Sequence, residues 1–189
     1  MRVIAGKARG RRLKRVPGDT TRPIMDRAKE SLFNILAPRL LDSSWLDMFA
    51  GTGAVGIEAL SRGAADVLFL DLARQAVRTI DENLQHTGLV QGSSVLRVDA
   101  LLYVARYAGP PFDFIYIAPP QYKGLWLDAL QLVDSGAARL LAPGGTAIVQ
   151  IDPKEFRETA LASLALVDQR RYGKTMLCFY AYEPEEEEE

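Results

Sequence analysis

An acidic residue followed by a Gly-x-Gly turn is the feature of this chain best suited to chemistry. Asp47 lies at the end of an apolar segment, Gly51 and Gly53 form the turn, and an amphipathic stretch follows directly. Glycines adopt backbone conformations closed to other residues and let a ligand lie against the main chain, while the carboxylate supplies hydrogen-bond acceptors. The pattern therefore predicts a cofactor cradle. Because Gly56 completes the G-x-G-x-x-G spacing of dinucleotide-binding folds, the turn alone leaves the cofactor open.

Polar residues also follow later apolar segments. Asp71 lies roughly 20 residues past the turn, where a carboxylate can accept from two ribose hydroxyls, and Asp99 ends the next segment. The segment Ala118-Pro119-Pro120-Gln121-Tyr122 ends a fourth. Its two prolines remove N–H donors and leave carbonyl acceptors, which suits a site for an amino group, and the tyrosine can stack on a nucleobase. The alternative interpretation is structural: solvated strand ends for the acids and a rigid loop for the prolines.

Alternating strands and helices would position these residues. Strands are expected over residues 45–48, 67–70, 95–98, 112–117 and 146–151, and helices over residues 25–36, 55–62, 73–85, 101–107 and 125–135. Short apolar strands joined by helices favour a parallel sheet with right-handed crossovers, which is an α/β fold. The last two segments, 165–171 and 175–182, predict a hairpin that adds an antiparallel strand.

Length and composition limit the function classes. A chain of 189 residues with 48% hydrophobic content predicts one domain with a substantial core and at most a small appendage. No apolar run approaches the roughly 20 residues that span a membrane, and the start lacks a signal-peptide pattern, so we expect a cytoplasmic protein with no membrane partner. The single Cys178 is expected to be a buried hydrophobe, and the single His86 an exposed polar residue at a helix end. No catalytic triad and no metal site are expected.

The charge is strongly asymmetric along the chain. Residues 1–40 hold 11 Lys/Arg against three Asp/Glu, whereas the remainder holds 12 against 21. The first 16 residues carry seven cations and no acid, which indicates a nucleic-acid surface, although a solvated basic hairpin is the alternative. The candidate RNA-binding residues are Lys7, Arg9, Arg11, Arg12, Arg22 and Arg27. The acidic end, residues 184–189, is expected to be disordered.

Several motifs together resemble one family. The string Asp47-Met48-Phe49-Ala50-Gly51-Thr52-Gly53 and the later Pro-Pro segment are similar to class I S-adenosylmethionine-dependent methyltransferases that methylate nitrogen. Arg22-Pro23, Asp26-Arg27, residues 30–36 and residues 56–64 resemble the RsmD family of bacterial 16S rRNA guanine-N2 methyltransferases. The similarity extends from the basic arm to the final hairpin and leaves out only the acidic tail. It implies a Rossmann-like, seven-stranded, mostly parallel sheet with the last strand antiparallel, plus an N-terminal basic hairpin and helix.

The resemblance also implies the cofactor, the partner and the site residues. S-adenosyl-L-methionine would lie in the glycine turn, and 16S rRNA or a small-subunit assembly intermediate would bind an RNA-binding extension at residues 1–40. Residues 41–183 would form the methyltransferase domain. A monomer is the default expectation for the oligomeric state. The implied cofactor-binding residues are Asp47, Phe49, Ala50, Gly51, Thr52, Gly53, Asp71 and Leu72, with Asp99 and Ala100 beside the adenine.

The Pro-Pro segment departs from the family pattern, which is Asp/Asn-Pro-Pro-Tyr/Phe. Ala118 replaces the carboxylate or amide, Gln121 replaces the aromatic residue, and Tyr122 follows one position later. Either the Pro119 carbonyl and Gln121 accept from guanine N2 while Tyr122 stacks, or the site is impaired; we favour the first. The catalytic candidates are therefore Ala118, Pro119, Pro120, Gln121 and Tyr122.

Two other functions compete with this interpretation. A catalytically impaired RNA-binding or ribosome-assembly factor that retains the cofactor fold would account for Ala118. A nicotinamide-dependent oxidoreductase would account for the glycines and Asp71, but it leaves the basic arm and the Pro-Pro segment unexplained.

Overall fold

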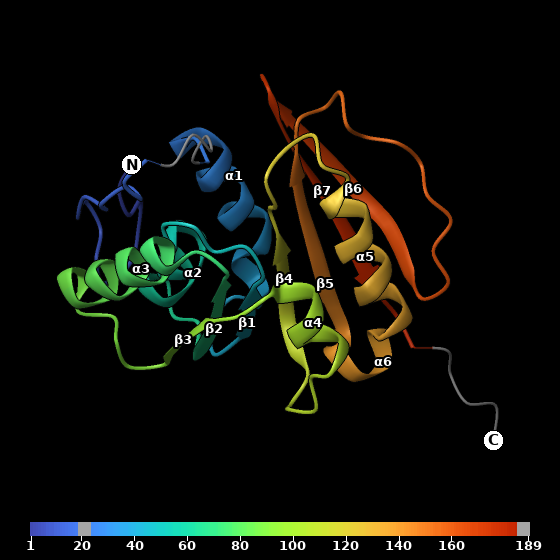
Figure 1. The fold of residues 1–189 in the computed structure, drawn as a ribbon, viewed down its shortest axis with the longest axis horizontal. Helices are drawn as coiled ribbons and strands as arrows, with labels where there is room; N and C mark the ends of the chain where they lie inside the picture. The colour runs from blue at the N-terminus through green and yellow to red at the C-terminus, as the bar shows by residue number, and fades with distance from the viewer. Residues whose placement is uncertain (19–23, 185–189) are drawn as a thin grey trace.

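A seven-stranded sheet lies between two layers of helices in the computed structural model, which describes residues 1–18 and 24–184 (Figure 1). The strand order is β3-β2-β1-β4-β5-β7-β6. β1 to β5 are mutually parallel, and β7 pairs antiparallel with both β5 and β6, so the predicted sheet with an antiparallel last strand is confirmed. The strands are β1 Ser44–Asp47, β2 Asp66–Asp71, β3 Ser93–Arg97, β4 Phe112–Ile117, β5 Leu141–Ile151, β6 Leu164–Tyr172 and β7 Thr175–Tyr182.

Each face of the sheet has its own hydrophobic core. One face packs against α1 Asp26–Leu36, α2 Ala54–Ser61 and α3 Arg74–Thr87. The other face packs against α4 Ala100–Ala105, α5 Leu125–Ser135 and α6 Ala137–Leu140. A short 3-10 helix, η1 Ala37–Arg39, follows α1. Burial on both faces explains why the central strands read as continuous apolar runs. Cys178 is buried in the second core, as expected, and burial raises the pKa of its thiol to about 11.

The predicted elements agree with the structure to within two residues except at the start of β5, and η1 and α6 were not predicted. This strand begins at Leu141, five residues before the predicted start. It includes Pro143, Gly144 and Gly145, which are residue types typical of turns. Phe112 pairs with Leu141 while Phe114 pairs with Thr146, so β5 bulges out against β4, and Gly144 takes a left-handed φ of 74° in the bulge. Arg22-Pro23, one of the motifs that resemble the RsmD family, lies outside the described residues.

The basic N-terminus folds back as a hairpin onto the helices. Arg2 and Arg12 form an antiparallel bridge, and Val3, Ala8 and Leu13 are buried in the same core as α2 and α3. The expected hairpin and helix extension is therefore present, and it shares its core with the rest of the fold. Within residues 1–18 and 24–184, no helix is long and apolar enough to cross a membrane.

Candidate functional site

The two glycines of the turn after β1 serve different purposes. Gly51 has a φ of 55°, and a Cβ built there would meet nothing within 4 Å, so its main chain borders open space. Gly53 has a φ of 76° and precedes α2; its added Cβ would lie 3.2 Å from Ile57 and 3.3 Å from Ile80. Gly51 therefore leaves room for a ligand, while Gly53 allows close packing of two helices on the turn.

Asp47 is a buried carboxylate that lacks a full set of partners. Its side chain is 2% exposed, and Oδ1 has no hydrogen-bond partner among the described residues. Burial raises the pKa of Asp47 to about 7, and the negative charge of Asp71 adds to this, whereas the nearby backbone amides of Gly56 and Phe49 oppose it. An unpartnered acceptor in such surroundings would be stabilised by a bound cationic group.

Asp71 and Asp99 organise the turns that follow β2 and β3. Asp71 accepts from Gly51 N and from Ala73 N, both at 2.9 Å, so it links two neighbouring strand ends. Because each carboxylate oxygen has two lone pairs, Asp71 can still accept from ligand hydroxyls. Asp99 caps α4 by accepting from Leu102 N at 3.0 Å.

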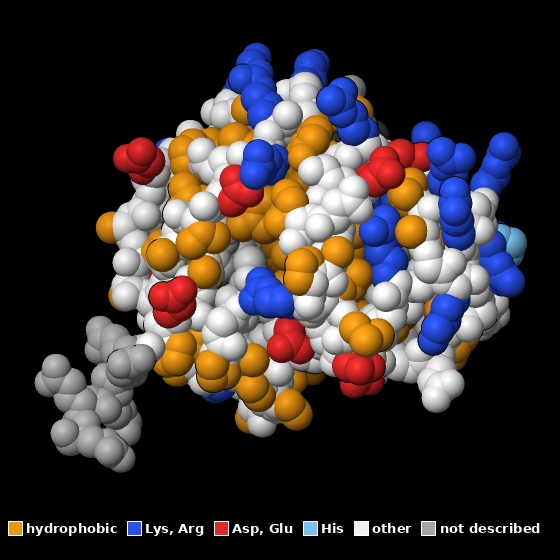
Figure 2. All heavy atoms as spheres, turned by 180° about the vertical axis from the view of Figure 1, so that it is seen from behind, with side chains coloured by type: hydrophobic (Ala, Val, Ile, Leu, Met, Phe, Trp, Pro, Cys, Tyr) orange, Lys and Arg blue, Asp and Glu red, His pale blue; other side chains and the backbone are white. Residues whose placement is uncertain are grey.

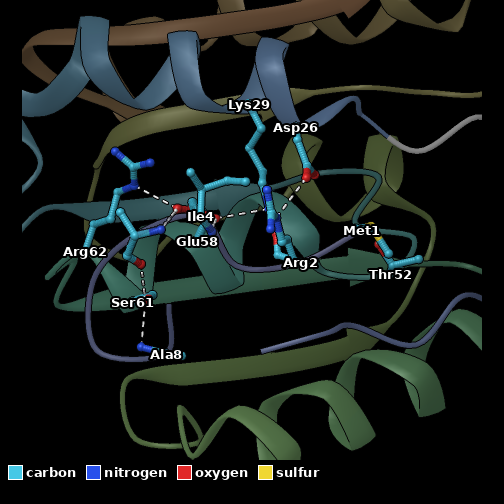
Figure 3. Close-up of polar contacts among 11 residues, drawn as sticks. Met1, Arg2, Ile4, Ala8, Asp26, Lys29, Thr52, Glu58, Ser61 and Arg62 are labelled. Carbon is cyan, nitrogen blue, oxygen red and sulfur yellow. Dashed lines mark hydrogen bonds and ion pairs between the residues drawn. The ribbon is translucent and has the colours of Figure 1, made fainter. Parts of the chain in front are cut away.

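The other expected cofactor residues surround the same turn. Ala50 is buried and donates its backbone N–H to Leu70 O at 2.9 Å. Phe49 is half-buried and packs against the second core. Ala100 is buried at the start of α4, whereas Leu72 is 64% exposed at the sheet edge. Thr52 donates from Oγ1 to the Met1 sulfur at 3.5 Å, which brings the chain terminus to the cofactor turn (Figure 3).

The Pro-Pro segment leaves β4 beside this turn. β1 and β4 are neighbours, with Asp47 paired to Tyr116, so the segment and the glycine turn emerge from adjacent strands at one sheet edge. Ala118 is half-buried, Pro119 is buried, and Pro120 and Gln121 are exposed. Tyr122 is 65% exposed and has a left-handed φ of 61°. Its phenol donates to Asp152 Oδ2 at 2.7 Å.

Asn83 holds the cofactor turn and the basic arm together, a role that the sequence did not reveal. This fully buried side chain donates to Thr52 O at 2.9 Å and to Lys14 O at 3.1 Å, and it accepts from Lys14 N at 2.8 Å. A polar residue on the apolar side of α3 is the only signal in the sequence, and it does not identify the partners. Asp152 and Glu155, which follow β5 and contact Tyr122, were missed for the same reason.

A second buried carboxylate fixes the basic arm. Glu58, on α2, accepts from the backbone amides of Ile4 and Ala5 at 2.8 and 3.0 Å. It also forms ion pairs with Lys29 at 3.0 Å and Arg62 at 2.8 Å (Figure 3). Burial lowers the pKa of Lys29, and the adjacent Glu58 opposes that shift. The arm is thus attached mainly through its main chain, while Arg2 and Lys14 form ion pairs with Asp26 and Glu82 at the surface.

Most of the proposed RNA-binding side chains are exposed. Figure 2 shows Lys and Arg side chains gathered along the edge of the molecule that carries the arm and α3. Arg11 donates to the backbone carbonyl of His86, which is itself exposed near the end of α3, as expected. Arg22 lies outside the described residues. The exposed cations among the candidates are Lys7, Arg9, Arg11, Arg12 and Arg27.

Comparison with known proteins identifies relatives that are named as methyltransferases. A family model described as "Conserved hypothetical protein 95" matches residues 1–181. Ribosomal RNA small subunit methyltransferase D of Escherichia coli K12 is 31% identical over 187 residues, covering 99% of this chain and 92% of that protein. The solved structure of yhhF from Escherichia coli, described as a candidate methyltransferase, has a TM-score of 0.85 and 31% identity, covering 97% of this chain and 98% of the other.

A more distant structure supports the fold alone. An RNA methyltransferase from Salinibacter ruber, solved with S-adenosyl-L-homocysteine, has a TM-score of 0.66 and 11% identity over 89% of this chain and 100% of the other. Sheet order, glycine turn and Pro-Pro segment together define a class I S-adenosylmethionine-dependent methyltransferase. Within that class, the chain belongs to the RsmD family.

The residues of the cradle fit S-adenosylmethionine. The cofactor carries a cationic amino group, a ribose with two hydroxyls and an adenine. Asp47 offers a buried oxygen without a partner among the described residues, and the main chain at Gly51 borders open space. Asp71 retains acceptor capacity at the same sheet edge.

Proposed function

We propose that this protein transfers a methyl group from S-adenosylmethionine to the exocyclic N2 amine of a guanine in 16S rRNA. The adjacency of two strand ends carries the proposal. Met48 N donates to Tyr116 O at 3.0 Å, so the cradle after β1 and the Pro-Pro segment after β4 lie side by side. Ligands of parallel α/β sheets bind at this edge.

In this proposal, the cradle residues hold the cofactor by complementary chemistry. Asp47 accepts from the amino group, and Asp71 accepts from the ribose hydroxyls. Asp99 accepts from the adenine amine. When bound, S-adenosylmethionine supplies a methyl group activated by a positively charged sulfur. The remaining members of the cradle are Phe49, Ala50, Gly51, Thr52, Gly53, Leu72 and Ala100.

The Pro-Pro segment orients the guanine. Pro119 and Pro120 lack N–H groups, so their carbonyls present acceptors without competing donors. With no side-chain acceptor at Ala118, the Pro119 carbonyl and the Gln121 amide oxygen accept from N2, and Tyr122 stacks on the base. The segment thus acts by positioning and by excluding water, and it needs no strong base.

The basic arm binds the RNA around the target. The residues that contact phosphates in this proposal are Lys7, Arg9, Arg11, Arg12 and Arg27, together with Arg22. Because the relative from Escherichia coli is named for the small ribosomal subunit, the proposed substrate is 16S rRNA or an assembling small subunit in the cytoplasm. The proposed active form is a monomer.

Methyl transfer to defined ribosomal particles tests this function. Labelled S-adenosylmethionine is incubated with the protein and with small-subunit or large-subunit particles that lack the modification. We expect label in 16S rRNA only. Asp71→Ala, which removes the acceptors of Gly51 N and Ala73 N, should abolish transfer. Tight RNA binding without transfer by the wild-type protein would contradict the proposal.

A further inference from the structure

Tyr122 is held at two points by residues that follow the neighbouring strand. Its phenol donates to Asp152 Oδ2 at 2.7 Å, and its backbone N–H donates to Glu155 Oε1 at 2.7 Å. β5 pairs directly with β4 up to Ile117 and Val149, so residues 152–155 emerge beside the Pro-Pro segment. The contacts therefore join two loops at the proposed methyl-transfer site.

The two acidic residues are themselves fixed. Asp152 is 6% exposed; its Oδ1 accepts from Lys154 N at 3.0 Å, and its backbone carbonyl accepts from Glu155 N at 2.9 Å. The backbone hydrogen bond from Lys154, followed by the bond from Tyr122, lowers the pKa of Asp152, so this carboxylate stays ionised and accepts from the phenol at neutral pH. A turn of this kind provides a rigid support for an exposed ring.

The conformation of Tyr122 requires such a support. Tyr122 and Asp42 are the two non-glycine residues with positive φ among residues 1–18 and 24–184. A left-handed backbone is unfavourable for a bulky residue and persists where surrounding contacts enforce it. Although the phenol and the backbone N–H of Tyr122 are hydrogen-bonded, the residue remains 65% exposed, so its ring stays accessible.

Glu155, the second residue that holds Tyr122, has one carboxylate oxygen without a partner among the described residues. Its Oε2 is buried and has no hydrogen-bond partner among the described residues, whereas its Oε1 is bonded to Tyr122. A buried carboxylate oxygen left unpaired is costly and marks a place where function competes with stability.

We propose that Asp152 and Glu155 are positioning residues that hold Tyr122 as the stacking surface for the target guanine. This inference rests on the proposed function and deepens it. Since Ala118 offers no polar side-chain atom to orient the base, orientation depends more heavily on a fixed ring and on the proline carbonyls. The ring is shifted by one position from the usual place in the family, and the turn after β5 holds it there.

The test compares variants that remove the ring with variants that only release it. Tyr122→Ala removes the stacking surface, and Tyr122→Phe keeps the ring but removes the bond to Asp152. Asp152→Ala removes the same bond from the other side, while Asp152→Asn retains an acceptor oxygen. Glu158→Ala is the matched control, because Glu158 is an exposed acid in the same loop.

The readout is kcat and KM for methyl transfer to unmodified small-subunit particles, with S-adenosylhomocysteine binding as a control for folding. Stacking on an aromatic ring predicts a loss of roughly 10- to 100-fold in kcat/KM for Tyr122→Ala. Tyr122→Phe and Asp152→Ala should each lose about 10-fold, mainly in kcat, with cofactor affinity unchanged. Asp152→Asn should recover most of the activity, and combining Tyr122→Phe with Asp152→Ala should cost no more than either change alone.

The possible failures are distinguishable. Wild-type kcat/KM in Tyr122→Phe and Asp152→Ala, together with active wild-type protein, would overturn the positioning role and leave the proposed function standing. A loss of the same size in Glu158→Ala would also overturn it, because the effect would then follow charge in the loop. Absence of transfer by the wild-type protein would overturn both proposals.

Discussion

Two buried carboxylates, Asp47 and Glu58, have different roles in this protein. Asp47 and Glu58 are both almost fully buried, yet their surroundings differ. Glu58 is paired with Lys29 and Arg62 and accepts from two backbone amides, whereas one oxygen of Asp47 has no partner among the described residues. The paired carboxylate is structural, and the unpaired one suits a ligand site.

Asp47 should make cofactor binding depend on pH. Its pKa in the folded protein is raised to about 7, above its ordinary value of 3.8, so the folded state binds more protons than the unfolded state between these values. Stability should therefore fall as pH rises from about 4 to 7, while S-adenosylhomocysteine affinity rises as the carboxylate ionises. Calorimetric titration from pH 5.5 to 7.5 measures the affinity. In Asp47→Asn both dependences should flatten, and an unchanged profile in this variant would argue against the role of Asp47.

Glu58 should contribute strongly to stability. Glu58→Gln leaves Lys29, whose side chain is fully buried, without a charged partner. Breaking a buried ion pair in this way costs about 3–5 kcal/mol. Urea unfolding measures the loss, and Glu82→Gln serves as the control because its partners Lys14 and Arg78 lie at the surface. Equal effects of the two substitutions would show that burial of the Glu58 network is unimportant.

At the scale of elements, the basic arm is built to dock on α2. Gly6 lies against the end of this helix: an added Cβ would stand 1.8 Å from Ser61 O, and Lys7 N donates to that same oxygen at 2.7 Å. Ser61 Oγ accepts from Ala8 N at 3.0 Å and donates to Ala5 O at 2.6 Å. The backbone of the arm is therefore fixed against the end of α2.

Gly6→Ala should detach the arm, whereas Gly10→Ala should not. Both glycines have a φ of 82°, so both substitutions carry the same backbone strain, but a Cβ at Gly10 meets nothing within 4 Å. We expect Gly6→Ala to weaken binding to a 16S rRNA fragment at least 10-fold more than Gly10→Ala, because the phosphate contacts lose their fixed arrangement. Fluorescence anisotropy measures the affinity. Indistinguishable affinities would mean that docking of the arm does not matter for RNA.

The sequence predicted the elements and residues that can be recognised from their neighbours along the chain. The glycine turn, the strand-end acids and the final hairpin depend on neighbours in sequence, and their positions agree with the structure. The roles of Asn83 and Asp152 depend on contacts with residues 69 and 30 positions away, which periodicity and turn chemistry do not encode. The early start of β5 was missed because a bulge lets Pro and Gly lie within a strand.

At the scale of the whole molecule, the basic arm and the cofactor turn are joined by direct contacts. The sequence has a formal net charge of −1, yet Lys and Arg side chains gather along the edge that carries the arm and α3 (Figure 2). Met1 of the arm contacts Thr52 of the cofactor turn. Asn83 connects the arm to Thr52 through a single side chain. Electrostatic attraction can therefore bring RNA to the sheet edge even though the protein as a whole is slightly acidic.

RNA binding should depend steeply on salt, while cofactor binding should not. Neutralising several phosphates releases counterions, so affinity for a 16S rRNA fragment should fall by at least 10-fold between about 50 and 200 mM salt. Arg9→Ala combined with Arg12→Ala should reduce the slope of log affinity against log salt by roughly 1 to 2. Filter binding over a salt series measures both. A slope unchanged by these substitutions would place the RNA elsewhere on the surface.

Identification of the methylated nucleoside tests the central claim most directly. Small-subunit particles lacking the modification are incubated with the protein and labelled S-adenosylmethionine, and the 16S rRNA is then digested and separated by chromatography and mass spectrometry. The account predicts that the label appears as N2-methylguanosine. Label on another nucleoside, or no label despite tight binding of both cofactor and RNA, would contradict it.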